Sequence, residues 1–230
     1  MSITRHIPNA LTCCNLICGC FGIISIYEGA SYLVPWFVII AGVFDFFDGF
    51  AARIFKVNSP IGKELDSLAD MVTFGVLPAM FMHHYLQNVV GAHWDLWYDP
   101  SILIAVCSAL RLAKFNVDPR QIDGFIGVPT PANAMFFVFM PFMLTYFHIE
   151  PNIYLIVGII LLFSWLMVSP LPLFSLKFKS FGWKGNEVRF TFLAAAVLLL
   201  AIFREAGMSL VIILYVLTSL VTGLKRPTGT

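Results

Sequence analysis

Four aspartates stand in two closely spaced pairs in a stretch of sequence that is otherwise mostly apolar. Asp45 and Asp48 are three residues apart, and Asp66 and Asp70 are four apart, so each pair projects from one face of its own helix. A carboxylate in the middle of a bilayer costs about 2.5–3.5 kcal/mol or more. The four acids must therefore face a cavity and share strong positive charge.

The nature of the ligand atoms indicates which cations supply that charge. Four neighbouring carboxylates raise one another's proton affinity unless divalent ions neutralise them. An all-oxygen ligand set suits Mg2+, Mn2+ or Ca2+ rather than zinc or copper. We expect two divalent cations, Mg2+ or Mn2+, with Ca2+ as an alternative occupant.

Small residues beside the aspartates leave room for a flat or charged ligand. Gly49 follows Asp48 directly, while Ala52 and Gly62 each lie four residues from an aspartate on the same helix. Arg53 ends the first helix with a guanidinium group that can hold a phosphate oxygen through paired hydrogen bonds. The pattern predicts a metal site that binds a phosphate-containing ligand.

The complete pattern D-x2-D-G-x2-A-R-x8-G-x3-D-x3-D resembles the signature of the CDP-alcohol phosphotransferase family of membrane enzymes, and the chain matches it without a departure. The resemblance implies that three residues ligate two divalent metals: Asp45, Asp48 and Asp66. It implies that Asp70 is the general base and a further metal ligand. It also implies contacts to the CDP moiety from Gly49, Ala52, Arg53 and Gly62.

Three further segments, 7–16, 108–116 and 125–132, resemble one branch of that family, the membrane-embedded CDP-diacylglycerol–serine O-phosphatidyltransferases. The branch implies CDP-diacylglycerol as donor, L-serine as acceptor, and phosphatidylserine and CMP as products. It further implies that Thr12 or Asn15 touches the nucleotide or diphosphate. The family resemblance also suggests a homodimer.

The chemistry of serine points to candidate acceptor-binding residues. Serine is a zwitterion whose carboxylate needs a fixed cation, whereas glycerol 3-phosphate would need several cations around a dianion. Arg111 is our first candidate for the carboxylate, with Lys114 and Arg120 as alternatives, and Asn116 is a candidate for orienting the substrate. For each cation the alternative interpretation is an anchor at the cytoplasmic membrane surface.

The elements that position these residues are predicted from composition and apolar runs. Hydrophobic residues make up 59% of the 230 residues and charged residues 12%, which predicts an all-α polytopic membrane protein with a cytoplasm-facing metal-binding cavity. Ser59 and Pro60 predict a helix start. We expect a single integral-membrane domain over 1–230 with about eight transmembrane helices, near 10–28, 33–54, 61–85, 100–116, 131–148, 152–170, 188–203 and 207–224.

The distribution of positive charge predicts the orientation. With eight spans, all of the 14 Lys and Arg residues except Arg204 fall on one side or at adjoining helix ends. The positive-inside rule places that side, both termini and the acidic motif in the cytoplasm. We expect a bacterial or archaeal cell membrane, lipid around the helices and no nucleic-acid partner.

Several alternatives remain open. Paired buried carboxylates also occur in cation transporters, although the fixed Gly, Ala and Arg beside the acids favour an enzyme. Phosphatidylglycerophosphate, phosphatidylinositol phosphate and archaetidylserine synthases would share every motif residue. His83, His84 and His93 fall at the predicted outer end, far from the acids, where we expect solvated or interfacial roles. The cysteines of 13–20 lack the paired spacing of zinc sites, which indicates ordinary small apolar residues.

Overall fold

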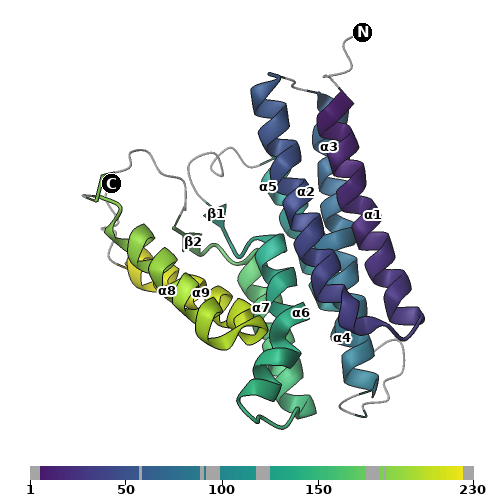
Figure 1. Cartoon of the computed structure of the whole chain (residues 1–230), viewed down its shortest axis with the longest axis vertical. Coiled ribbons are helices and arrows are strands. Elements are labelled where there is room, and N and C mark those ends of the chain that lie inside the picture. Colours follow the sequence, from purple (N-terminus) through teal and green to yellow (C-terminus); the bar gives the residue numbers. More distant parts are fainter. Residues whose placement is uncertain are drawn as a thin grey trace.

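The computed structural model describes residues 6–56, 59–88, 91, 99–117, 125–174, 182–183 and 185–224. Helices form almost all of this part of the chain (Figure 1), which confirms the all-α prediction. In chain order they are α1 (Ile7–Tyr27), η2 (Ser31–Leu33), α2 (Val34–Ile54), α3 (Pro60–Asp70), η3 (Met71–Val76), α4 (Leu77–Asn88), α5 (Ile102–Val117), α6 (Thr130–Tyr146), α7 (Ile153–Val168), α8 (Glu187–Phe203) and α9 (Glu205–Leu224). A short antiparallel pair, β1 (Phe125–Ile126) and β2 (Pro172–Leu173), accompanies them.

Each predicted span overlaps one of these helices or a continuous series of them. The span predicted at 61–85 corresponds to α3, η3 and α4, which follow one another without a break, and η3 is π-helical. Within the described residues, four helical stretches are long and apolar enough to cross a bilayer: Ile7–Tyr27, Ser31–Ile54, Pro60–Asn88 and Glu205–Thr222. The chain is therefore an integral membrane protein, and the total of about eight crossings stays a prediction.

Local sequence explains where the helices begin. Ser59 caps α3 by accepting a hydrogen bond from the backbone N–H of Gly62 at 3.3 Å, and Pro60 occupies the first turn, as predicted. Asn152 caps α7 in the same way by accepting from the N–H of Tyr154 at 2.8 Å. These caps fix the starts of α3, which carries several charged residues, and of α7, whose sequence is almost entirely apolar.

Close helix contacts hold the acid-bearing elements together. Figure 1 shows α1, α2 and the α3–η3–α4 series side by side. A Cβ added at Gly19 of α1 would lie 2.4 Å from the Thr73 Oγ1 atom, so only glycine lets α1 approach η3 this closely. The adjoining core is apolar and includes Phe74 and Leu77, both fully buried. This packing fixes α1 against the helix that carries Asp70.

The C-terminal half of the chain packs against the other side of this core. Helices α8 and α9 form a hairpin that is tilted away from α1 and α2 (Figure 1), and the Ser209 hydroxyl of α9 donates to the Phe136 carbonyl of α6 at 3.0 Å. Before α6 the chain turns at Gly127 with φ of 75°, where an added Cβ would lie 2.2 Å from the Met167 carbonyl oxygen. The start of α6 is thereby fixed to the end of α7.

Candidate active site

Three of the predicted metal ligands form one group. Asp45 and Asp48 project from α2 and Asp66 projects from α3, and each offers a carboxylate oxygen within 4.8 Å of the other two. Asp48 is buried, whereas Asp45 and Asp66 are half-buried. The i, i+3 spacing in α2 and the contact between neighbouring helices bring the three side chains together.

The surroundings of these carboxylates fit divalent cations. Among the described residues, no Lys or Arg forms an ion pair with any of the three. The Asp66 Oδ1 atom is buried and has no hydrogen-bond partner within the same residues. Buried carboxylates are normally paired or bound to metal, and an all-carboxylate group suits hard ions. The donor set therefore fits the predicted class of metal.

Asp70 lies one helical turn beyond Asp66 and has a different environment. Its carboxylate is 8% exposed and accepts a hydrogen bond from the Asn15 Nδ2 atom of α1 at 3.0 Å. It is not one of the three acids whose oxygens cluster within 4.8 Å. Asp70 is thus held beside the group by a neutral donor, which leaves its Oδ2 atom for other chemistry. Its predicted role as a further ligand stays a prediction.

Polar side chains of α1 orient the acids of two other helices. The Thr12 hydroxyl lies 2.7 Å from the Asp48 Oδ2 atom, to which it donates, and 3.1 Å from the Pro8 carbonyl oxygen. The Thr73 hydroxyl of η3 donates to the Asn15 backbone carbonyl at 3.1 Å. Thr12 and Asn15 are three residues apart in an apolar helix, and this spacing places them on one face. Their predicted contacts to nucleotide or diphosphate stay predictions.

A cavity of about 190 Å³ lies beside the acids. It is lined by Pro8, Asn9, Thr12, Asp48, Gly49, Ala52, Ser59, Gly62, Lys63 and Asp66. Three of the four predicted CDP contacts are on this wall, and a Cβ added at Gly49 would meet no atom within 4 Å. Arg53, the fourth, is exposed near the end of α2 and is not part of the lining. The small motif residues thus leave open space next to the carboxylates.

Lys63 is a cation of this wall that lies outside the sequence motif. Its Nζ atom donates to the backbone carbonyl of Asn116 at 2.9 Å. The Asn116 amide in turn donates to the Ser67 hydroxyl at 2.8 Å, so Asn116 joins the end of α5 to α3. Its position one residue after the motif residue Gly62, near the start of α3, is the sequence feature that could have identified Lys63 as part of the wall.

The predicted serine-binding cations have unequal positions. Arg111 is buried in α5, where its Nη1 atom donates to the Thr130 hydroxyl at 3.2 Å. The charge of its guanidinium group interacts electrostatically with Asp70. Lys114 is exposed one turn further along α5. Arg120 lies outside the described residues. Of the two described cations, Arg111 alone is buried and close to a motif aspartate.

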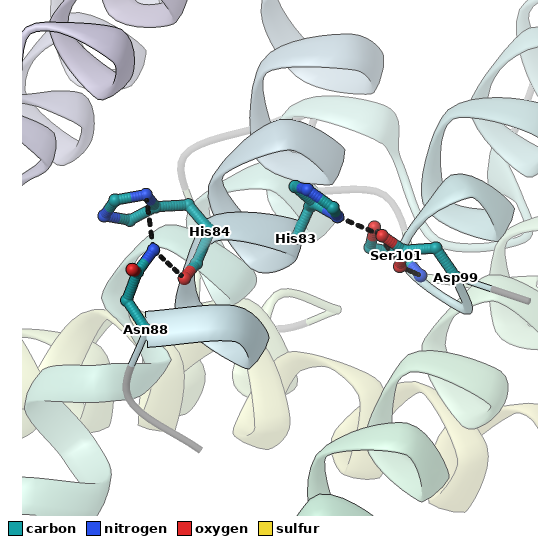
Figure 2. A network of polar contacts seen from close by, with 5 residues as sticks. All are labelled: His83, His84, Asn88, Asp99 and Ser101. Atoms are coloured by element: carbon teal, nitrogen blue, oxygen red, sulfur yellow. Dashed lines mark hydrogen bonds and ion pairs between the residues drawn. The ribbon is translucent and has the colours of Figure 1, made fainter. Parts of the chain in front are cut away.

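A separate polar network lies at the far end of α4 (Figure 2). Asp99 pairs with the His83 Nδ1 atom through one carboxylate oxygen and accepts from the backbone N–H and hydroxyl of Ser101 through the other. Burial alone would raise the pKa of Asp99, but the hydrogen bonds from Ser101 and His83 lower it below its usual value. The network joins α4 to the start of α5.

This network is remote from the metal group, as predicted for the histidines. His83 lies 13 residues beyond Asp70 along a continuous helical series, which corresponds to roughly 20 Å. His84 forms a contact within its own helix, to the Asn88 amide at 3.0 Å (Figure 2). His93 lies outside the described residues. The described histidines of this end therefore stabilise local structure and do not ligate the predicted metals.

Residues 5–169 match the family model described as CDP-alcohol phosphatidyltransferase. The match covers more than half of the chain and includes all four motif aspartates. This chain belongs to the CDP-alcohol phosphatidyltransferase family. The resemblance to CDP-alcohol phosphotransferases is confirmed, as is the assignment to enzymes rather than transporters. Enzymes of this family use divalent metals, and the group formed by Asp45, Asp48 and Asp66 fits that requirement.

Curated relatives of this family member carry a more specific name. A Bacillus subtilis protein named CDP-diacylglycerol–serine O-phosphatidyltransferase is 38% identical over 141 residues, which cover 60% of this chain and 76% of the relative. A Helicobacter pylori protein of the same name is 34% identical over 169 residues, covering 70% and 69%. A Methanocaldococcus jannaschii protein, again of that name, is 30% identical over 156 residues, covering 68% and 70%. The resemblance to this branch is confirmed.

Proposed function

We propose that this chain transfers the phosphatidyl group of CDP-diacylglycerol to the hydroxyl of L-serine, giving phosphatidylserine and CMP. The observation that supports it most directly is the similarity to three relatives named for this reaction, from two bacteria and an archaeon. The burial of Arg111 close to Asp70 agrees with it, because a fixed cation beside the candidate base suits the carboxylate of a zwitterionic acceptor.

Asp45, Asp48 and Asp66 hold two divalent cations, Mg2+ or Mn2+, in this proposal, with Asp70 as an additional ligand. When bound, the metals neutralise the diphosphate and the charge that develops on the leaving group. Thr12 supports this arrangement through its hydrogen bond to Asp48. The lack of any ion pair between these acids and a described Lys or Arg is consistent with a charge supplied by metal.

Asp70 is the general base. Its Oδ2 atom accepts the proton of the serine hydroxyl while the hydroxyl oxygen attacks the phosphorus attached to diacylglycerol, and the bond from that phosphorus to the CMP oxygen breaks. A carboxylate is a weak base for an alcohol, so proton transfer must accompany formation of the new bond. Asn15 holds the Oδ1 atom and fixes the orientation in which Oδ2 meets the acceptor.

The nucleotide occupies the cavity beside the metals. Gly49, Ala52 and Gly62 provide a wall without bulky side chains for the cytidine, and Lys63 adds a cation to the same wall. Arg53, which is exposed on the last turn of α2, is the proposed partner of the phosphates. On the acceptor side, Arg111 binds the serine carboxylate. Lys114, Asn116 and Arg120 are weaker candidates. Asn116 already joins two helices through its hydrogen bonds.

The setting of the reaction is a cell membrane of a bacterium or archaeon. The chain forms one integral domain over 1–230 with its termini and active site in the cytoplasm, as the positive-inside rule indicates. CDP-diacylglycerol reaches the acids laterally from the cytoplasmic leaflet. The functional unit is a homodimer, in keeping with the family resemblance.

The test is CMP release by the purified protein in detergent with CDP-diacylglycerol and Mg2+ or Mn2+. Serine, glycerol 3-phosphate and inositol phosphate are offered separately, with a metal-free control. We expect release that needs both serine and metal, and release with another acceptor alone would refute the serine assignment. Asp66→Asn should abolish the activity, whereas Glu64→Gln, at an exposed acid of the same helix, should preserve it.

A further inference from the structure

The start of α6 carries two polar side chains in a helix whose other buried positions are almost all apolar. Thr130 and Asn133 are three residues apart, so they lie one turn apart on the same helix face, and both are fully buried. Both amide atoms of Asn133, Nδ2 and Oδ1, have no hydrogen-bond partner within the described residues. Buried amides are normally paired, because an unpaired polar group forfeits its hydration without replacement.

A second incompletely paired side chain lies at the same place. Arg111 of α5 donates from Nη1 to the Thr130 hydroxyl at 3.2 Å, but its buried Nε atom has no partner within the described part of the chain. Arg111 is 5% exposed, and its guanidinium group interacts electrostatically with Asp70. Arg111 thus bonds to Thr130 and keeps one donor that has no described partner, and the amide of Asn133, also without a described partner, lies one helical turn from Thr130 on the same face of α6.

We propose that Asn133 recognises the α-amino group of the acceptor and thereby selects an amino acid. Asn133 Oδ1 accepts from the ammonium group, and Nδ2 donates to the carboxylate, which also accepts from Arg111 Nε. This inference rests on the proposed transfer to serine and adds a specificity residue to it. Neither the motif nor the segments that carry the branch resemblance include position 133.

The chemistry of the competing acceptors explains why an amide would select among them. A zwitterion presents ammonium donors and carboxylate acceptors on one carbon atom, and a single amide complements both. Glycerol 3-phosphate and inositol phosphate have no ammonium group, so they would leave the Asn133 carbonyl unpaired in a buried site. Sites built to bond one polar group discriminate strongly against ligands that lack it.

The test compares serine with 3-hydroxypropionate, which is serine without its amino group. We measure kcat/KM for both acceptors and the KM for CDP-diacylglycerol. In Asn133→Leu, kcat/KM for serine should fall about tenfold to hundredfold, and the preference for serine should shrink. In Asn133→Asp, which keeps an acceptor and adds negative charge, the preference should grow. The KM for CDP-diacylglycerol should stay within about twofold of the wild-type value in both variants.

The preference is the ratio of kcat/KM for serine to kcat/KM for 3-hydroxypropionate. Opposite shifts of this ratio in the two Asn133 variants distinguish recognition from a structural role. Ser164→Ala is the matched control, because Ser164 of α7 is also buried and its hydroxyl is also unpaired among the described residues; its ratio should equal that of the wild type. An unchanged ratio in both Asn133 variants, equal losses with both acceptors, or the same shift in the control would overturn the inference while the proposed function stands. If Asn133→Leu does not fold, Asn133→Asp decides. Wild-type CMP release without any use of serine would overturn both.

Discussion

Replacing Asn15 by leucine removes the amide donor that the structure places on the Asp70 Oδ1 atom. The two atoms are 3.0 Å apart, Asn15 is fully buried and Asp70 nearly so, which leaves little access for water to replace the lost bond. Leucine has a similar shape and no polar atom, so α1 should keep its packing. The Oδ2 atom of Asp70 then loses the fixed orientation in which it meets the acceptor hydroxyl.

The size of the effect follows from the kind of bond. A hydrogen bond to a charged group contributes about 1.5–3 kcal/mol, which corresponds to roughly tenfold to 150-fold in rate. Because Asn15 acts on the base, the loss should appear in kcat with serine and leave the KM for CDP-diacylglycerol within about twofold. Initial rates of CMP release, with each substrate varied in turn, separate the two constants.

Ser25→Ala supplies the control. Ser25 is buried on the same helix, and its hydroxyl donates to the Gly22 carbonyl at 2.7 Å. It lies ten residues beyond Asn15, or roughly 15 Å along the axis, so its kcat should stay within about twofold of the wild-type value. If Asn15→Leu keeps the wild-type kcat, Asn15 does not position the base. If it raises the KM for CDP-diacylglycerol alone, Asn15 contacts the diphosphate instead.

Four further outcomes are expected. Asp70→Asn should abolish turnover and leave substantial CMP affinity, as equilibrium binding would show, and retained turnover would remove the assignment of Asp70 as base. Gly62→Leu should raise the KM for CDP-diacylglycerol about tenfold, because the new side chain starts 3.0 Å from Asn9 Oδ1 and projects from the cavity wall; an unchanged KM would place the nucleotide elsewhere. Saturating Mg2+ or Mn2+ should raise the melting temperature, since ions at 100 times their Kd add about 2.7 kcal/mol to the free energy of unfolding, and Asp66→Asn should remove the gain. The lowered pKa of Asp99 stabilises the fold at pH values above the ordinary aspartate pKa of about 4, and this stabilisation is lost as the pH falls through the lower pKa of the folded state. Asp99→Asn should therefore have a lower melting temperature at pH 7 and lose less stability on acidification than the wild type. Parallel melting profiles across pH would contradict this.

The sequence predicted those features that depend on local spacing. The apolar runs located the helices to within a few residues, and Ser59 and Pro60 identified the start of α3, because caps and periodicity act within one or two turns. The motif likewise identified the acids, since i, i+3 and i, i+4 spacing determines which of them share a helix face. That Asp66 meets the pair from α2 followed from the motif as a whole.

Contacts between helices were beyond such reasoning. Nothing in the spacing showed that Thr12 would bond Asp48 or that Asn15 would bond Asp70, because the relative rotation of α1 is set by close packing at Gly19. The β1–β2 pair was missed because strands of two residues carry no periodic signal. The buried, unpaired amide of Asn133 could not be predicted, because the sequence does not show whether a single asparagine in an apolar helix finds a partner among the described residues.

The α3–η3–α4 series is one continuous helix, and the π-helical segment η3 sets how the residues of α3 are rotated about the helix axis relative to those of α4. One π-type insertion adds a residue to a helix, and one residue corresponds to roughly 100° of rotation. Asp66 and Asp70 lie before this insertion, and Phe74 and Leu77 lie within it or directly after it. Deleting one residue here would restore a regular α-helix and turn either the acids or the apolar face away from its neighbours. The number of residues in η3, as much as the identity of the aspartates before it, therefore determines the direction in which their carboxylates project.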